Sequence, residues 1–283
     1  MALNVIGELI NHAYARARRA FTARDAAGYQ HLARLQADLG VQALSINLDT
    51  TRNLDVTMGE VLARLPEVIG AVQNATDLPL AFDSPALEYH QTALAHYDRR
   101  RGDPPIVNSI AASRPDLDQW LELVAAHDTR VVVMASEHAV AGSTARCLRA
   151  EDSHAVAKYF VKRLINEAGR TRDQIFIDPG LFPFSTGTYG LVNNSLAAIR
   201  LIRQDPDLAG VHCIVGLSNF AWDVPAAKRS QLENAYLTLA MEAGLDYVIA
   251  NPERRPAPLA ADHAAVSALR TALANGADAA SHS

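Results

Sequence analysis

Eight short apolar segments recur along the chain, with roughly 25 to 44 residues between the starts of successive segments. Each segment is a nearly unbroken apolar run instead of an alternation of apolar and polar residues. This pattern is typical of strands that are covered on both faces. We therefore predict eight strands, at residues 4–8, 43–47, 78–83, 105–110, 130–136, 174–179, 211–218 and 247–251.

Helical spacing of apolar residues appears between these runs. In the segment 26–40, for example, Leu32, Leu35 and Leu39 form one stripe, and Gly40 is a suitable residue to end the helix. The alternation of strand and helix favours an α/β fold of the (β/α)₈ TIM-barrel type in one domain, residues 1–275, with a doubly wound open sheet as the alternative. Residues 276–283 are expected to form a disordered C-terminal tail. The predicted helices are 26–40, 115–128, 152–169, 228–244 and 261–276.

Composition excludes several classes of protein. The chain has 283 residues, 49% of them hydrophobic, and a net charge of −5, so it lacks the basic surface that binding to nucleic acid requires. Its one basic run, residues 99–101, is flanked by Asp98 and Asp103 and is typical of a solvated loop. No apolar run is long enough to span a membrane, and Cys147 and Cys213 have no disulfide-framework or zinc-ligand spacing. We expect a cytoplasmic protein without a bound metal.

Polar residues follow the predicted strands, where a TIM barrel places its active site. Asp and Asn dominate this set, which contains no Lys, His or Cys. Such residues can bind a hard cation through oxygen atoms, or they can pair with the N–H groups and ring nitrogens of a flat heterocycle. Any single one is more often a turn former or a helix cap, so the prediction depends on many of them converging. The set is Glu8, Asn11, Asn47, Asp49, Asp83, Ser84, Asn108, Ser109, Ser136, Glu137, Asp178, Ser218, Asn219 and Asn251.

Six motifs, in order and spacing, carry a family resemblance. The sequence resembles the pterin-binding methyltransferases and, more narrowly, the methyltetrahydrofolate:corrinoid methyltransferases. The resemblance implies a TIM barrel like that of dihydropteroate synthase, which binds tetrahydrofolate or 5-methyltetrahydrofolate as substrate. It also implies a homodimer and a separate corrinoid protein that presents cobalamin. The motifs are IGELIN (6–11), FDSP (82–85), VNSI (107–110), IDPG (177–180), GLSN (216–219) and LAMEAGLDYVIAN (239–251).

The resemblance assigns roles to particular residues. Asp83, Asn108 and Asp178 match the family's three main pterin contacts, and Asn219 matches its mobile asparagine, which hydrogen-bonds N5 of the pterin. Asn219 is therefore the expected catalytic residue, because its amide can stabilise charge that develops on N5. Further pterin contacts are expected from Glu8, Asn11, Asn47, Gly216 and Ser218.

Gly216 has no side chain and would let the backbone approach a flat ring. Trp222 is a candidate contact for the corrinoid or the folate tail, or else a packing aromatic. The long connection 136–154 is expected to contact the partner protein or the glutamate tail.

The sequence departs from the family pattern around the mouth. The family's E-R-I-N motif has Leu9 in place of arginine, Ser45 replaces an aspartate, and Trp222 replaces a polar residue. A family Asn-Arg pair aligns with Glu233 and Asn234, so a second arginine is absent. These changes indicate a divergent subfamily of the kind that moves a methyl group from a methyl-corrinoid protein onto tetrahydrofolate, although the same site catalyses both directions.

Three other functions remain open at this point. Dihydropteroate synthase shares the architecture, but its pyrophosphate leaving group calls for basic side chains and a glycine-rich loop. Strand 7 is followed here by Ser218, Asn219 and Phe220 in place of a Ser-Arg-Lys cluster, and strand 2 by a segment that has Arg52 but no glycine. A catalytically silent folate-binding subunit is compatible with the missing arginines. Metal-dependent chemistry on Asp83, Asp178 and Glu137 would require a bound divalent cation.

Overall fold

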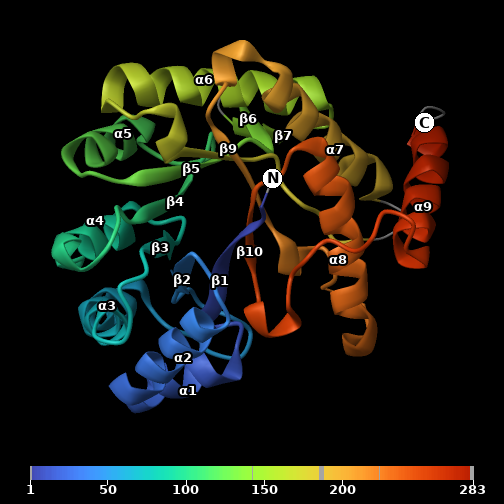
Figure 1. The fold of residues 1–283 in the computed structure, drawn as a ribbon. Helices are drawn as coiled ribbons and strands as arrows, with labels where there is room; N and C mark the ends of the chain where they lie inside the picture. Colours follow the sequence, from blue (N-terminus) through green and yellow to red (C-terminus); the bar gives the residue numbers. More distant parts are fainter. Residues whose placement is uncertain (1, 142, 185–187, 223, 281–283) are drawn as a thin grey trace.

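The computed structural model describes residues 2–141, 143–184, 188–222 and 224–280. Eight parallel strands close into a barrel in the order β1-β10-β9-β8-β5-β4-β3-β2. Figure 1 shows the helices as an outer ring around these strands. The predicted TIM barrel is confirmed, and the doubly wound sheet is wrong because β1 pairs with both β2 and β10. The strands are β1 (Asn4–Asn11), β2 (Ala43–Asn47), β3 (Leu80–Asp83), β4 (Ile106–Ile110), β5 (Arg130–Met134), β8 (Ile175–Asp178), β9 (His212–Gly216) and β10 (Tyr247–Ala250).

The helices pack against the outside of the barrel. They are α1 (Ala15–Ala23), α2 (Ala26–Asp38), α3 (Met58–Gln73), α4 (Leu87–His96), α5 (Leu117–Ala126), α6 (Ala150–Ala168), α7 (Tyr189–Gln204), α8 (Ala226–Ala243) and α9 (Ala264–Ala280). Helix α9 includes residues 276–280 of the expected tail, and residues 281–283 lie outside the described part, so the tail stays a prediction. Helix α9 packs against α7 and α8, at the right of Figure 1.

Two apolar cores explain why the strands are nearly continuous apolar runs. One face of each strand points into the barrel, where Ile6, Ala81, Ile106 and Phe176 belong to one buried cluster. The other face packs against the helices in a larger cluster that includes Phe82. Since both faces are buried, neither face selects for polar residues.

The connection after β5 contains an additional antiparallel hairpin, β6 (Glu137–Val140) and β7 (Ser143–Arg146). Each of these strands has only four residues, all of them half-buried or exposed. They therefore lack the continuous apolar run from which the barrel strands were predicted. The hairpin adjoins α6 and belongs to the end of the barrel where the polar strand ends lie.

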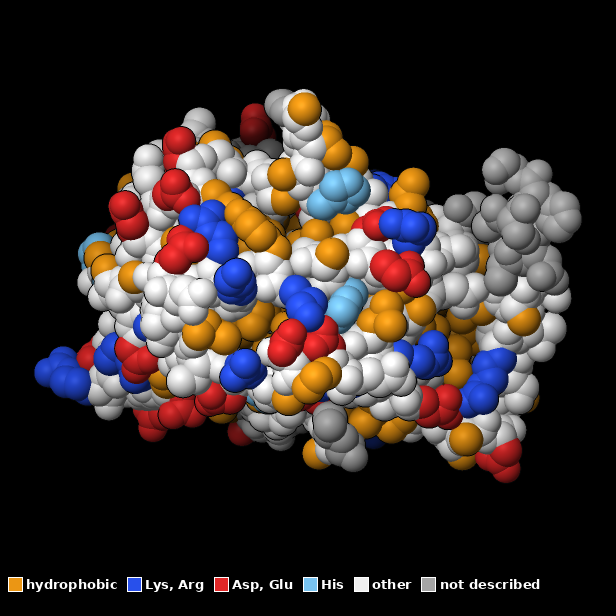
Figure 2. Space-filling view, turned by 90° about the horizontal axis from the view of Figure 1, so that it is seen from above, with side chains coloured by type: hydrophobic (Ala, Val, Ile, Leu, Met, Phe, Trp, Pro, Cys, Tyr) orange, Lys and Arg blue, Asp and Glu red, His pale blue; other side chains and the backbone are white. Residues whose placement is uncertain are grey.

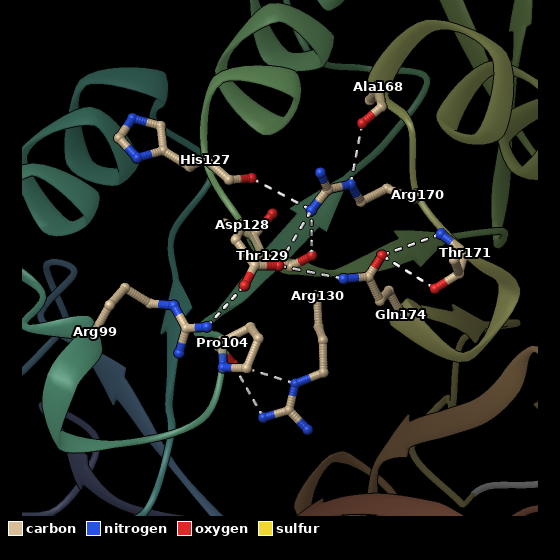
Figure 3. Close-up of polar contacts among 10 residues, drawn as sticks. All are labelled: Arg99, Pro104, His127, Asp128, Thr129, Arg130, Ala168, Arg170, Thr171 and Gln174. Atoms are coloured by element: carbon tan, nitrogen blue, oxygen red, sulfur yellow. Dashed lines mark hydrogen bonds and ion pairs between the residues drawn. The ribbon is translucent and has the colours of Figure 1, made fainter.

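At the opposite end of the barrel, polar side chains bond to one another and to backbone carbonyls (Figure 3). Asp128 accepts from Arg99 at 2.7 Å and from Gln174 at 3.4 Å, and Arg170 donates to the Thr129 carbonyl at 2.8 Å. These contacts join the turns that precede β4, β5 and β8. This end therefore contributes to stability, and the carboxyl ends of the strands are left for a site.

Candidate functional site

A cavity of about 390 Å³ opens at the carboxyl ends of the strands. All nine residues predicted to contact the pterin line it, namely Glu8, Asn11, Asn47, Asp83, Asn108, Asp178, Gly216, Ser218 and Asn219. The rest of the lining is Ser84, Pro85, Ser109, Arg114, Met134 and Ile249. The convergence that the sequence required is therefore present.

Two carboxylates of this cavity are unusually hard to ionise. Burial raises the pKa of Asp178 to about 7, a rise that the negative charge of Asp83 reinforces and that the Gly180 N–H, donating to Asp178 at 2.7 Å, opposes. Burial likewise raises the pKa of Asp83 to about 6, opposed by a hydrogen bond from Asn47. A ligand whose N–H groups donate to these carboxylates would stabilise their ionised form and lower both pKa values.

Glu8 ties together two connections at the rim of the cavity. Its Oε1 accepts from the hydroxyl of Tyr14 and from that of Ser218, the latter at 2.5 Å. Tyr14 belongs to the β1–α1 connection, and Ser218 lies in the 3₁₀ turn η5 (Leu217–Asn219) that follows β9. Because Ser218 precedes Asn219, Glu8 fixes the backbone from which the expected catalytic amide extends.

A buried ion pair lies beside this carboxylate. Arg254, in the 3₁₀ turn η6 (Pro252–Arg254), donates to Glu233 at 2.6 Å, and the Glu233 side chain is 3% exposed. Burial raises the pKa of Glu233, while Arg254 counteracts the rise. Burial also raises the pKa of Tyr14, and the positive charge of Arg254 partly offsets that rise. The positive charge of Arg254, in the connection that follows β10, thus acts on the hydrogen-bonded pair of Glu8 and Tyr14.

Gly216 and Asn219 lie against each other. A Cβ atom added to Gly216 would lie 3.1 Å from the Nδ2 of Asn219, closer than nearly all such contacts in proteins. Gly216 has an ordinary negative φ of −81°, so its role is not conformational. The absence of a side chain makes room for the Asn219 amide, which is a reason that the sequence alone did not indicate.

Arg114 is a cavity residue that the sequence analysis missed. It follows β4, and its guanidinium donates to the carbonyl and the hydroxyl of Ser109 at 3.0 and 3.2 Å. Burial raises the pKa of both Asp49 and Asp83, and the positive charge of Arg114 opposes that rise. The sequence does place Arg114 in the connection after β4, just before Pro115, the first residue of the predicted helix 115–128. Only residues that directly follow a strand were predicted to line the site, and Arg114 lies further along.

Several predicted strand-end residues lie outside the cavity lining. Asp49 accepts from Ser84 at 3.0 Å, Glu137 accepts from the Ser113 N–H at 2.8 Å, and Asn251 caps η6. Asn251 thus has the cap role that such residues usually have, and Asp49 and Glu137 join separate connections to each other. Trp222 is also outside the lining, and at 55% exposure it is one of the most exposed large apolar residues described.

The described residues include no group of three or more His, Cys, Asp or Glu side chains arranged to hold a metal ion. Cys147 and Cys213 are separate buried thiols. No helix within the described ranges is long and apolar enough to cross a membrane.

Comparison with known proteins identifies the family. The family described as pterin binding enzyme matches residues 8–251, which include every residue of the cavity lining. The chain belongs to the pterin-binding enzyme family. The methylcorrinoid:tetrahydrofolate methyltransferase of Eubacterium limosum is 27% identical to it over 257 residues, 89% of this chain and 86% of that protein. Methionine synthase of Mycobacterium tuberculosis is 25% identical over 230 residues, which are 75% of this chain but only 18% of that much longer protein.

Solved structures of dihydropteroate synthases show the same fold. The dihydropteroate synthase of Vibrio fischeri superimposes with a TM-score of 0.62 at 17% identity, over 97% of this chain and 93% of that one. The Xanthomonas albilineans synthase in complex with 7,8-dihydropteroate gives a TM-score of 0.58 at 22% identity, over 100% of this chain and 95% of that one. At these identities the likeness establishes the barrel and leaves the reaction open.

Proposed function

We propose that this protein transfers a methyl group between a corrinoid, carried by a partner protein, and N5 of tetrahydrofolate. The observation that carries the proposal is the position of the Asn219 amide, packed on Gly216 at the rim of a cavity that Asp83, Asn108 and Asp178 line. The 27% identity to a methylcorrinoid:tetrahydrofolate methyltransferase over most of both chains supports it.

The cavity lining suits a pterin. The amino group and ring N–H groups of a pterin are donors, and the carboxylates of Asp83 and Asp178 are acceptors. Asn108 both donates and accepts, so it can pair with an edge that presents both kinds of group. Arg114 adds a donor and offsets part of the negative charge of the two carboxylates.

The reaction itself is a displacement. In the direction toward tetrahydrofolate, the N5 lone pair forms a bond to the methyl carbon, and the electron pair of the broken cobalt–carbon bond stays with the corrinoid. N5 then carries a positive charge and an N–H, which donates to the Asn219 amide oxygen until the proton leaves to solvent. Because this hydrogen bond strengthens as the charge develops, it lowers the barrier, and the same argument holds for the reverse direction.

The methyl donor would be a methylcorrinoid, which is the donor in the name of the Eubacterium limosum relative. We expect a partner protein to carry this corrinoid. We favour transfer from the methyl-corrinoid onto tetrahydrofolate for this chain. The homodimer that the resemblance implies stays a prediction.

Two alternatives have less support. A dihydropteroate synthase must hold a pyrophosphate, and Arg114 is the one cation in the cavity lining described here, already bonded to Ser109. A catalytically silent subunit is favoured only by the missing motif arginines. Formation of dihydropteroate from its two precursors, assayed beside methyl transfer, separates the synthase from the methyltransferase.

The test combines binding and turnover. Calorimetric titration with tetrahydrofolate measures the pterin site, and methyl transfer from methylcobalamin measures the reaction. Asn219→Ala should lower kcat by about 100-fold with little change in folate Kd, a loss typical of a removed charge-stabilising group. Asn166→Ala, an exposed asparagine on α6, is the matched control. Unchanged turnover in Asn219→Ala would remove its assigned role, and no folate binding by the wild type would overturn the proposal.

A further inference from the structure

The Asn219 amide owes its position to the turn that carries it. Among the described residues, its side chain has no hydrogen-bond partner. The end of this turn is fixed in the core, because the N–H of Phe220 donates to the Leu217 carbonyl at 3.0 Å and its carbonyl accepts from the Phe184 N–H at 2.8 Å. Phe220 itself is fully buried. The turn, η5, has Ser218 as its one polar side chain besides Asn219, so the contact of Ser218 decides how closely the amide is held.

Ser218 is held by a residue from the first strand. Its hydroxyl donates to Oε1 of Glu8 at 2.5 Å, although the two residues are 210 positions apart in the sequence. Strand β10 lies between β1 and β9 in the barrel, so this contact spans a strand and no backbone ladder sets its geometry. Glu8 lines the open cavity, where a carboxylate with a single partner could rotate toward water. The contact with Ser218 therefore depends on what else holds Glu8.

Tyr14 is the second partner of Glu8. Its hydroxyl donates to the same Oε1 atom that Ser218 contacts. The backbone of Tyr14 is fixed at the start of α1, because its N–H donates to the Asn11 carbonyl at 2.8 Å and its carbonyl accepts from the Arg18 N–H at 3.1 Å. Its ring packs against the main apolar core. Burial, followed by the negative charge of Glu8, raises the pKa of Tyr14, so the hydroxyl keeps its proton and remains a donor.

These contacts differ from the ion pairs on the outer surface. The α6 side of the molecule carries basic and acidic side chains next to each other (Figure 2). In one such pair, Lys158 and Asp207, both side chains are exposed, and pairs of this kind fix little geometry because water competes for both partners. Glu8 is only 9% exposed, so water has little access to replace its two hydroxyl partners. The protein itself therefore sets where Glu8 and Ser218 lie.

We propose that Tyr14 is a positioning residue for the Asn219 amide and that it acts through Glu8 and Ser218. The inference rests on the methyl transfer proposed above and adds to it a residue that does not line the cavity. Without the Tyr14 hydroxyl, Glu8 keeps one partner and can rotate, and turn η5 then holds Asn219 less closely to N5. Because Tyr14 lies outside the cavity lining, its hydroxyl should affect the rate of transfer and leave folate binding unchanged.

The substitution Tyr14→Phe removes the hydroxyl and keeps the ring. Methyl transfer from methylcobalamin to tetrahydrofolate gives kcat, and calorimetric titration with tetrahydrofolate gives Kd. We expect kcat to fall by about tenfold, since one of two contacts is lost and a misplacement of about 1 Å costs about 100-fold. Kd should stay within about twofold of the wild-type value, as for a substitution that does not touch the ligand. Tyr29→Phe is the matched control, because its buried hydroxyl on α2 has no partner among the described residues, and its kcat should equal that of the wild type.

The same substitution in an Asn219→Ala background tests the route of the effect. If Tyr14 acts through the amide, Tyr14→Phe should change the kcat of Asn219→Ala by less than about twofold. A further loss of about tenfold in that background would overturn the inference, because Tyr14 would then act independently of Asn219. The inference is also overturned if the kcat of Tyr14→Phe equals that of Tyr29→Phe, or if Tyr14→Phe loses folate binding. Absence of methyl transfer by the wild type would instead overturn the proposed function, and the inference with it.

Discussion

Asp178 offers a test in which the same substitution should raise stability and remove ligand binding. Its carboxyl group is partly buried, and its pKa is raised from the ordinary 3.8 to about 7. An acid whose pKa is higher in the folded state than in the unfolded state favours folding at low pH. That contribution is fully present below pH 3.8 and is lost as the pH rises through 7. At pH 8 the ionised carboxylate therefore opposes folding.

The size of the effect follows from the shift. One pKa unit corresponds to about 1.4 kcal/mol, so about three units give Asp178→Asn a gain in unfolding free energy of up to about 4 kcal/mol at pH 8. At pH 5 the folded wild type is protonated and only the unfolded chain is ionised, which reduces the gain to about 2 kcal/mol. Water in the open cavity solvates the carboxylate, so these values are ceilings. The asparagine oxygen can still accept from the Gly180 N–H.

Denaturant unfolding of the wild type and Asp178→Asn at pH 8 and pH 5 measures this gain. Asp262→Asn, at an exposed position, should change stability by less than about 0.5 kcal/mol at either pH. Folate titration of Asp178→Asn should show loss of binding at both pH values. The reasoning is refuted if Asp178→Asn is less stable than the wild type at pH 8, or if the gain is as large at pH 5 as at pH 8.

Two further substitutions test the rim. Gly216→Ala would place a methyl group 3.1 Å from the Asn219 amide and displace it. We expect kcat to fall by about 100-fold, the loss typical of a misplacement of about 1 Å, with a smaller change in folate KM. Activity equal to that of the wild type would show that Asn219 need not occupy this position. Trp222→Ala should raise the KM for the corrinoid protein and leave folate affinity unchanged, since Trp222 is exposed and lies outside the cavity; a change in folate affinity instead would assign it to the folate.

All eight barrel strands could be predicted because a strand buried on both faces leaves a signal that depends on no other part of the chain. The helices left weaker signals. Helices α1, α3, α4 and α7 were not among the predicted segments, although Thr57 and Glu60 form a capping box that marks the start of α3. Pro66 lies inside α3, where a proline argues against a continuous helix.

The cavity residues were predicted to the extent that they directly follow strands. Asp83 and Asp178 are the last residues of β3 and β8, so the fold alone places them at the mouth. Arg114 and Arg254 come from connections, and no periodicity fixes where a connection folds. Contacts such as that of Glu8 with Ser218, between the first and seventh strand ends of the barrel, are set only when the barrel closes.

The contrast between residues that follow strands and residues from connections bears on the missing motif arginines. Those arginines were the reason to consider a catalytically silent subunit. The resemblance matches Leu9 and Asn234 to arginines of the family, yet the fold brings Arg114 to the cavity wall and Arg254 next to the buried Glu233. Arg114 offsets part of the rise in the pKa of Asp83, and Arg254 does the same for Glu233, so connections supply positive charge near these carboxylates. Loss of an arginine from a motif therefore does not indicate loss of activity when the structure provides cations from other elements, and turnover has to be measured on this chain.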